Sequence, residues 1–318
     1  MHESCTGPSF SHSIGNLSHL FQLSVTAQHA LVEKMVGFDL ETSGLLSDPE
    51  AQIIEVAMTA SHGDSHFLVN PTTPLTRDQW ELVWKISGIT QTQLDKGVKP
   101  LQALWSVVSF LNSTTGSSTA LVWNHPFDYA FVLRSLLGQT VCPIQGRIVL
   151  GMDDLDIEIP RDAVDWAHIA PLFSYIQAEE VVMRVFDAKL FACVSLIREV
   201  VKDFDSSLGH LWPCMPVGSP FLEQAVRDIW FSMTLDTARA IFSPDAPDFG
   251  PAHRALPDAK LAKRIALDCI GSTGADILQR LEQGPTRRDQ LRTGTARHRF
   301  EQIAHVVDGV RSRLQESV

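Results

Sequence analysis

Residues 34–45 read Lys-Met-Val-Gly-Phe-Asp-Leu-Glu-Thr-Ser-Gly-Leu, and this stretch decides the fold. Its apolar first half predicts a buried β-strand that ends in two carboxylates, Asp39 and Glu41. Because strand side chains alternate between faces, the two carboxylates point the same way. They repel each other unless a cation lies between them, and oxygen ligands of this kind suit Mg²⁺ or Mn²⁺. A solvent-exposed strand end with two acidic residues is the alternative for this motif alone.

The sequence around this strand predicts a mixed α/β sheet of five strands. Residues 51–60 and 66–69 have the composition of the next two strands and are separated by a Gly-Asp turn, so three antiparallel strands come first. The apolar spacing of 101–111 predicts a helix, which leads to a fourth strand over 119–123. Residues 231–236 are predicted as the fifth strand.

Helical patterns account for most of the remaining chain. Ser219 and Pro220 are typical of a helix start, and Pro257 is expected in the first turn of another helix. Gly138 is expected to end the helix that follows the fourth strand. The predicted helices, in chain order, cover 128–137, 178–203, 220–230, 257–270, 275–283 and 300–314.

Composition places the chain among soluble globular proteins. It has 318 residues, 44% of them hydrophobic and 20% charged. No run approaches the ~18–20 uncharged apolar residues that cross a membrane, and residues 1–16 lack the regions of a secretory signal. Five scattered cysteines without a CxxC spacing indicate neither a zinc site nor a disulfide framework, so a reducing cytoplasm is the expected setting.

Charge is unevenly distributed along the chain. The net charge of −11 argues against broad adhesion to nucleic acid, but not against a nucleic-acid enzyme, because bound metal ions supply local positive charge. Residues 285–318 hold seven arginines and four acidic residues, a net charge of +3, which leaves −14 for the rest. This basic helical tail either tracks a phosphate backbone or forms an ordinary solvated helix. Residues 1–30 are predicted as a mobile leader and 31–284 as the main domain.

Two further motifs carry acids and a histidine. Asn-His-Pro-Phe-Asp at 124–128 follows the predicted fourth strand and places Asp128 at a helix start, where an acid also favours the helix dipole. His-Arg-Ala-Leu-Pro-Asp at 253–258 places His253 on a loop and Asp258 in the first helical turn. A loop histidine, with an ordinary pKa of about 6.5, can take a proton from a water molecule. A lone surface histidine is the alternative.

In this order, the three motifs resemble those of the DEDDh 3′–5′ exonucleases, the superfamily of polymerase proofreading subunits, RNase T and oligoribonuclease. The five matching residues are Asp39, Glu41, Asp128, His253 and Asp258. Supporting segments are also similar to the family's, namely Ile-Ile-Glu-Val-Ala at 53–57, Gly-Ile-Thr at 88–90 and Asp-Thr at 236–237. The resemblance covers about residues 34–137 and 231–270 and implies an RNase H-like fold.

The resemblance also implies a two-metal hydrolysis. Asp39 would bridge two Mg²⁺ or Mn²⁺ ions. Glu41 and Asp258 would hold the ion that binds the attacking water, and Asp128 would help to hold the second ion. His253 would act as the general base. Two ions ~3.5–4 Å apart would stabilise the attacking and leaving oxygens of an in-line displacement.

The same resemblance implies a substrate and a product. Single-stranded DNA would be cut at its 3′ end to release nucleoside 5′-monophosphates, which places the chain in DNA repair. The backbone after the first motif would contact the terminal nucleotide at Thr42, Ser43 and Leu45, with Leu45 packing against the base. Asn124 and Phe127 would complete this pocket, although a core position is the favoured alternative for Phe127.

The chain departs from the family in three places. Trp123 and Ser87 stand where many members have histidine, which concerns substrate contacts rather than metal ligands. Residues 139–230 are longer than a minimal member needs, so we expect a mostly helical insertion that walls the substrate cleft. A protein partner could bind through this insertion or the tail. The insertion's acidic residues at 153–158 are predicted as a solvated loop, with an additional metal site as the alternative.

Two alternatives to a DNA exonuclease stay open. The first is a 3′–5′ exoribonuclease that trims short RNA or RNA ends, which a comparison of DNA and RNA oligomers separates. The second is a non-catalytic nucleic-acid-binding scaffold, against which all five catalytic side chains are present. The oligomeric state does not follow from the sequence.

Overall fold

The chain divides into two compact units in a computed structural model. The sheet unit comprises Glu33–Asp187 and Asp248–Ala262, and the helical unit comprises Met1–Val32, Ala188–Pro247 and Lys263–Val318. The predicted leader, main domain and tail have other boundaries and stay a prediction. The structure describes residues 20–45, 47–113, 119–124, 127–128, 131–132, 150–151, 183–204, 219–284 and 294–316.

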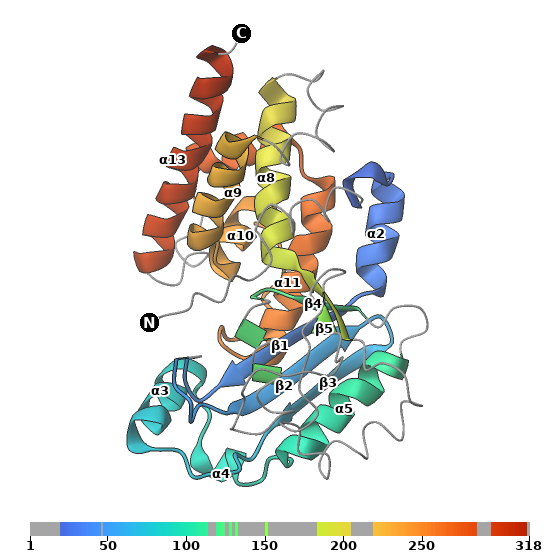
Figure 1. Ribbon diagram of the computed structural model, residues 1–318, viewed down its shortest axis with the longest axis vertical. Helices are drawn as coiled ribbons and strands as arrows, with labels where there is room; N and C mark the ends of the chain where they lie inside the picture. Colours follow the sequence, from blue (N-terminus) through green and yellow to red (C-terminus); the bar gives the residue numbers. More distant parts are fainter. Residues whose placement is uncertain are drawn as a thin grey trace. The chain divides into compact units, whose positions relative to one another are not determined.

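The sheet unit is built on a six-stranded mixed sheet with the order β3-β2-β1-β4-β6-β5 (Figure 1). β2 is antiparallel to β1 and β3, whereas β4 is parallel to β1, β6 to β4 and β5 to β6. The predicted α/β class, its mixed sheet and its three leading antiparallel strands are confirmed, whereas the sheet has six strands in the described residues rather than the five expected. The strands are β1 (Val36–Thr42), β2 (Ile53–Ala60), β3 (Gly63–Leu68), β4 (Thr119–Val122), β5 (Leu150–Gly151) and β6 (Met183–Asp187).

The predicted fifth strand over 231–236 is wrong. These residues form the end of α9 (Pro220–Ser232) and the start of α10 (Leu235–Phe242). Thr234 separates the two helices as an N-cap, because its hydroxyl accepts a hydrogen bond from the amide of Thr237. The apolar run that suggested a strand therefore spans a helix junction.

The parallel strand next to β4 is β6, in a segment predicted as helix. The helix expected over 178–203 is wrong at its start, since Met183–Asp187 is extended and α8 (Ala188–Phe204) begins only after it. A short run such as Met-Arg-Val-Phe-Asp fits either state by periodicity, and pairing with β4 decides for the strand. Residues 178–182 lie outside the described residues.

The other predicted helices are confirmed where the structure describes them. The largest difference is at the last helix, which begins at Gly294 rather than at residue 300. Residues 127–128 and 131–132 of the helix after β4 are helical, and the acidic residues at 153–158 lie outside the described residues. These helices are α5 (Pro100–Ser113), α11 (Ala255–Gly271), α12 (Gly274–Gln283) and α13 (Gly294–Glu316).

β1 separates an apolar face of the sheet from an acidic one. Phe38 and Leu40 are buried in the main core together with α5, which packs against β2 (Figure 1). Asp39 and Glu41 alternate with them and therefore point to the opposite face. Burial of the apolar face fixes the register, so the two acids cannot exchange places with the core residues.

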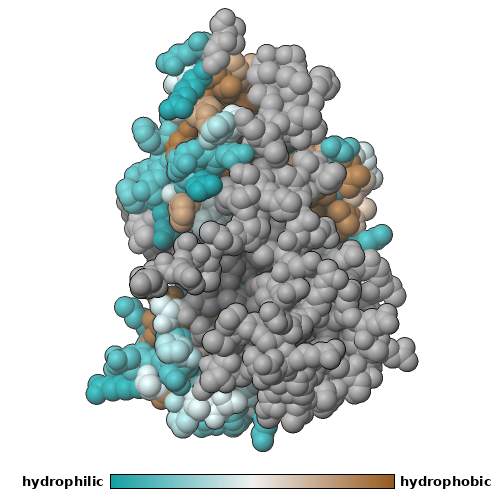
Figure 2. Space-filling model, viewed as in Figure 1, coloured by the Kyte–Doolittle hydropathy of each residue, from teal (hydrophilic) through white to brown (hydrophobic). Residues whose placement is uncertain are grey.

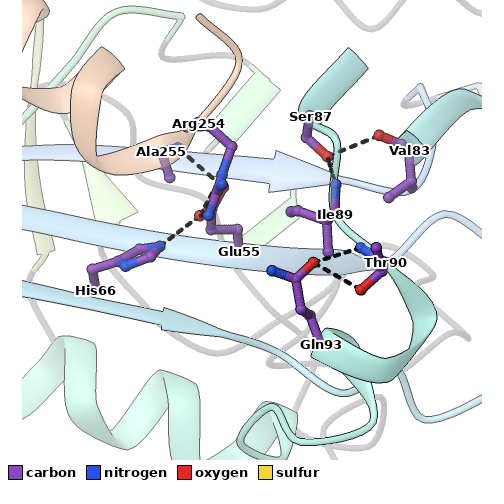
Figure 3. A network of polar contacts seen from close by, with 9 residues as sticks. All are labelled: Glu55, His66, Val83, Ser87, Ile89, Thr90, Gln93, Arg254 and Ala255. Atoms are coloured by element: carbon purple, nitrogen blue, oxygen red, sulfur yellow. Dashed lines mark hydrogen bonds and ion pairs between the residues drawn. The ribbon is translucent and has the colours of Figure 1, made fainter. Parts of the chain in front are cut away.

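A smaller core joins α3 (Arg77–Ser87) and α4 (Gln91–Leu94) to β2. Gly88 ends α3 with φ 68°, a left-handed conformation that glycine adopts without steric cost. Figure 3 shows that the Ser87 hydroxyl donates to the carbonyl of Val83 (2.8 Å), so Ser87 stabilises this turn. The buried members of the smaller core are Ile54, Leu75, Val83, Ile89 and Leu94.

The helical unit packs α8, α9, α10, α12 and α13 against one another. α13 buries an apolar stripe, while the face seen in Figure 2 is mainly hydrophilic. Its arginines contact neighbours: Arg297 lies 3.4 Å from Glu301, Arg311 lies 3.6 Å from Glu282, and Arg313 lies over the Phe221 ring. The described part of the tail is thus a packed helix, and phosphate binding by it stays a prediction. The buried stripe consists of Ala296, Phe300, Ile303, Val307 and Val310.

One exposed apolar patch belongs to α2 (Val25–Lys34) and the residues before it. Leu23, Val25 and Leu31 are exposed there. Figure 2 shows a brown, hydrophobic area over this part of the surface. Within the described residues, no helix combines the length and apolar character needed to cross a membrane.

Candidate active site

The acidic face begins at the end of β1. Asp39 and Glu41 are half-buried there, opposite Ala57 and Glu55 of β2 respectively. The pairing of β1 with β2 becomes irregular immediately after Glu41, where Thr42 pairs out of step. Such irregularities often redirect a strand next to a functional site.

Asp128 reaches the same end of β1 from the neighbouring strand. β4 runs parallel to β1 and stops where Val122 pairs with Phe38, so the turn that follows lies beside the end of β1. The Asp128 residue is only 3% exposed, and it makes backbone hydrogen bonds with Leu40 and Asn124. The carbonyl of Asn124 accepts from the Asp128 amide (3.2 Å) and so starts the helical turn.

The third motif joins the cluster from a loop and the first turn of α11. Ligand atoms of Glu41, His253 and Asp258 all lie within 4.8 Å of one another. The His253 amide donates to Asp258 Oδ2 (3.0 Å), which couples the loop to the helix. His253 is exposed, and its backbone has φ 57°, an unusual value for a non-glycine residue.

The electrostatics confirm how close these groups lie. Burial, then Asp128, Glu41 and Asp258, raise the pKa of Asp39 well above its usual value. Burial, followed by Asp258, Glu55 and Asp128, raises the pKa of Glu41 to about 9. Asp128, Glu41 and Asp258 all act on Asp39, so the structure brings together the four acids that the sequence singled out.

Burial also dominates at Asp128. It raises the pKa of this carboxyl well above the usual value, even though backbone hydrogen bonds lower it, and Asp187 raises it further. Buried carboxylates with this little compensation must bind protons or a cation. The hard oxygen donors of these carboxylates suit a small divalent ion such as Mg²⁺ or Mn²⁺.

Glu55 is a functional candidate that sequence reasoning did not select. Its carboxylate accepts from Arg254 Nε (2.9 Å) and Nη2 (2.7 Å), from the Ala255 amide (3.2 Å) and from His66 Nε2 (2.5 Å) (Figure 3). Burial alone would raise its pKa, but the bonds from His66, Arg254 and Ala255 outweigh burial and lower it. The signal was a single acid inside the apolar strand Ile-Ile-Glu-Val-Ala.

Asp187 is a second residue that was missed. It ends β6, pairs with Val122 of β4 and is buried. Asp236 and Thr237, which resemble the Asp-Thr pair that often precedes the family's third motif, lie in the first turn of α10 in the helical unit. The sequence signal for Asp187 was an acid at the end of a mainly apolar run. It was overlooked because a helix was expected over this segment.

The residues predicted to contact the substrate differ in their exposure and in their hydrogen bonds. Leu45 is 66% exposed and free to pack against a ligand. Ser43 is fully buried, and its hydroxyl accepts from the Gln52 amide (2.9 Å), so its side chain stabilises the loop. Thr42 is half-buried, and its hydroxyl donates to the Gly44 carbonyl (2.7 Å).

The remaining two substrate candidates belong to the turn after β4. Asn124 is half-buried, and its carbonyl also accepts from the Phe127 amide (2.9 Å). Phe127 packs against the main core, with its ring centre 4.8 Å from that of Phe131. The core alternative for Phe127 therefore agrees with the geometry.

Comparison with known proteins adds little to this picture. No protein-family model matches the chain, and no curated protein matches it. Among solved structures, the chain is similar to S. pombe Pop2p in an Mg²⁺- and Mn²⁺-bound form, with 14% identity and a TM-score of 0.38. That similarity covers 79% of this chain and 88% of the other. This similarity is too low to indicate a function, which must be inferred from the side chains of this chain.

Proposed function

We propose that the protein is a metal-dependent 3′–5′ exonuclease that acts on single-stranded DNA. One observation carries the proposal: four carboxylates and a histidine from three distant segments meet at the end of β1. The ligand atoms of Glu41, His253 and Asp258 lie within 4.8 Å of one another, and Asp39 and Asp128 act on the same group. Structural acids are normally spread apart or paired with cations, whereas these are buried together.

Asp39, Glu41, Asp128 and Asp258 are the residues that would hold two divalent ions. When bound, such ions supply positive charge that stabilises a phosphoryl transition state and acidify water. The carboxylates' own contribution is a dense negative site that favours cation binding and releases protons on binding.

His253 is the proposed general base. Its residue is exposed, so water and a nucleic-acid end can reach it. The bond from its amide to Asp258 fixes the loop, which leaves the imidazole to take a proton from the attacking water. The water oxygen forms a new bond to the terminal phosphorus, the bond to the 3′ oxygen of the preceding nucleotide breaks, and that oxygen takes up a proton. A nucleoside 5′-monophosphate is released.

A substrate panel tests the proposal. Single-stranded DNA and RNA oligomers with a 5′ label are incubated with the full chain in Mg²⁺, in Mn²⁺ or in EDTA, with Asp39→Asn as the matched control. We expect stepwise shortening from the 3′ end, faster on DNA, that requires metal and is lost in the control. Faster cleavage of RNA would establish the exoribonuclease alternative. No release from a folded wild type on any substrate would overturn the proposal in favour of a binding scaffold.

A further inference from the structure

Glu55 is a buried acid whose hydrogen-bonding capacity is taken up by protein groups. Its side chain is fully buried, and its two oxygens accept bonds from Arg254, Ala255 and His66. Arg254 Nε lies 2.9 and 3.1 Å from the two oxygens, which makes a forked contact. A carboxylate engaged in this way has little capacity left for a metal ion, so Glu55 acts through its neighbours.

The donors to Glu55 come from two segments that the sequence keeps far apart. His66 belongs to β3, next to β2, whereas Arg254 and Ala255 lie 199 and 200 residues beyond Glu55 in the third motif. Figure 3 shows the Arg254 and Ala255 groups converging on Glu55 from one side and His66 from the other. Glu55 thus connects the third motif to the sheet that carries Asp39 and Glu41.

Arg254 is well placed to control the geometry of the third motif. It follows His253 directly, and its carbonyl accepts the amide of Asp258 (3.1 Å) at the start of α11. His253 needs a positive φ of 57°, which a histidine holds only when its neighbours are fixed. Arg254 and Ala255 are the neighbours on its carboxyl side, and both are bonded to Glu55.

We propose that Glu55 and Arg254 are positioning residues for the proposed nuclease site. Their ion pair holds the third-motif loop on β2 so that His253 and Asp258 face Glu41. Glu55 stands directly opposite Glu41. The ion pair of Glu55 with Arg254 therefore sets the distance between Glu41 and the third motif. This inference rests on the proposed function for its catalytic consequence, while its effect on metal binding can be measured separately.

The test compares variants of the pair in the full chain. Glu55→Gln and Arg254→Gln remove one partner each, and Arg254→Lys keeps the charge but loses the fork. The first measurement is Mn²⁺ affinity by calorimetry without substrate, and the second is the split between kcat and KM for oligonucleotide cleavage. Partners that orient metal ligands typically contribute about 10–100-fold to affinity or activity, so we expect losses of that size in Mn²⁺ affinity and kcat with little change in KM.

Two further results distinguish positioning from general stability. The double variant Glu55→Gln/Arg254→Gln is expected to lose no more than either single variant, because one interaction is removed in each case. Excess Mn²⁺ is expected to recover part of the kcat, which a misfolded fraction would not do. Lys260→Gln is the matched control, since Lys260 makes a different ion pair between α11 and the sheet, with Asp64, and both side chains are partly exposed. It should retain wild-type Mn²⁺ affinity.

The outcomes separate this inference from the proposed function. Folded glutamine variants with wild-type Mn²⁺ affinity and kcat would overturn the positioning role. If the glutamine variants do not fold, Arg254→Lys decides, and wild-type Mn²⁺ affinity in that variant overturns the role as well. A wild type that releases no nucleotide, but whose Mn²⁺ affinity falls in the variants, would leave the positioning role intact and remove only the nuclease activity.

Discussion

Glu41 and Glu55 stand opposite each other on β1 and β2, yet their surroundings act on them in opposite directions. Burial and the neighbouring acids, Asp258 first among them, raise the pKa of Glu41 to about 9. Burial acts in the same sense on Glu55, but bonds from His66 and Arg254 outweigh it and lower the pKa. Two residues of one type, on adjacent strands of one sheet, therefore have different chemistry.

The role of a buried acid therefore depends on whether nearby protein groups donate hydrogen bonds to it. Glu55 is satisfied inside the protein by an arginine, a histidine and a backbone amide, so it serves as an anchor. Glu41 lies among acids, and Arg254 stabilises its ionised form only in part, so a bound cation would be needed to stabilise that form fully. A carboxylate that protein donors satisfy can thus be distinguished from one that lies among other acids, even when their positions in the sheet are equivalent.

The largest expected effect is that of Asp39→Asn on catalysis. Asp39 interacts with all the other acids of the cluster, so its loss removes charge from the centre of the proposed metal site. Several kcal/mol of transition-state stabilisation correspond to about a 10³-fold loss of nucleotide release or more. Activity is measured by 3′-end shortening and Mn²⁺ binding by calorimetry. Full activity in this variant would remove the cluster as the reaction site.

His253→Ala sharpens the division of labour within the cluster. Loss of a general base typically lowers the rate by about 10²-fold or more, whereas the four carboxylates proposed to hold metal stay in place. We expect a low kcat with Mn²⁺ affinity close to that of the wild type. The same two measurements are used, and an unchanged kcat would exclude His253 as the base.

Stability measurements in EDTA compare the two opposed glutamates directly. Glu55→Gln breaks a buried ion pair and should lower the free energy of unfolding by about 3 kcal/mol. Without metal at neutral pH, a Glu41 carboxyl with a pKa of about 9 already carries a proton, so Glu41→Gln replaces one neutral group with another and we expect little loss of stability. Urea denaturation gives both values. Equal losses in the two variants would contradict the comparison.

The pH dependence of stability should show the same opposition. The pKa of Glu41 rises from 4.5 to about 9 on folding, so its contribution is present below pH 4.5 and is lost as the pH approaches 9. The pKa of Glu55 is lowered, so its contribution is present above its ordinary pKa and is lost on acidification.

In EDTA, the melting temperature should therefore fall between pH 5 and pH 9, by at least about 2–4 °C, the shift that 1 kcal/mol gives in a domain of this size. Excess Mn²⁺ should reduce this fall, because metal binding is stronger once the carboxylates are ionised. Scanning calorimetry measures both series, with Glu41→Gln as the control that flattens the EDTA curve. A melting temperature that rises steadily to pH 9 in EDTA would be the opposite outcome.

The smallest effect is expected at the basic helix α13, whose charged side chains are exposed rather than buried. Arg297 is 75% exposed and pairs with Glu301, so Arg297→Gln should change the free energy of unfolding by less than about 0.5 kcal/mol. If α13 binds phosphate, the same substitution should reduce the salt slope of oligonucleotide binding by about one. Removing the whole helix is a poorer test, because it exposes Phe300 and Ile303.

Much of the fold followed from local patterns in the sequence. The apolar run before Asp39 predicted β1, and the alternation of a strand predicted the shared face of its two acids. Helical spacing predicted α5, and the helix-start signals at Ser219-Pro220 and Pro257 predicted α9 and α11. The error at 231–236 arose because a short apolar run does not distinguish a strand from a helix junction. β6 was missed for the same reason, since only its pairing with β4 makes Met183–Asp187 a strand.

By itself, the sequence determined the inventory of the site: Asp39 and Glu41 on one strand face, Asp128 at a helix start, and His253 with Asp258 in a loop and first turn. These features depend on spacing within a few residues, which periodicity and capping control. Only the tertiary structure decided that Glu55 is paired with Arg254, whereas Glu41, among the described residues, lies mainly beside other acids. That assignment depends on Arg254, 199 residues away from Glu55, and the cost of an unpaired buried charge appears only when the chain has brought the two together.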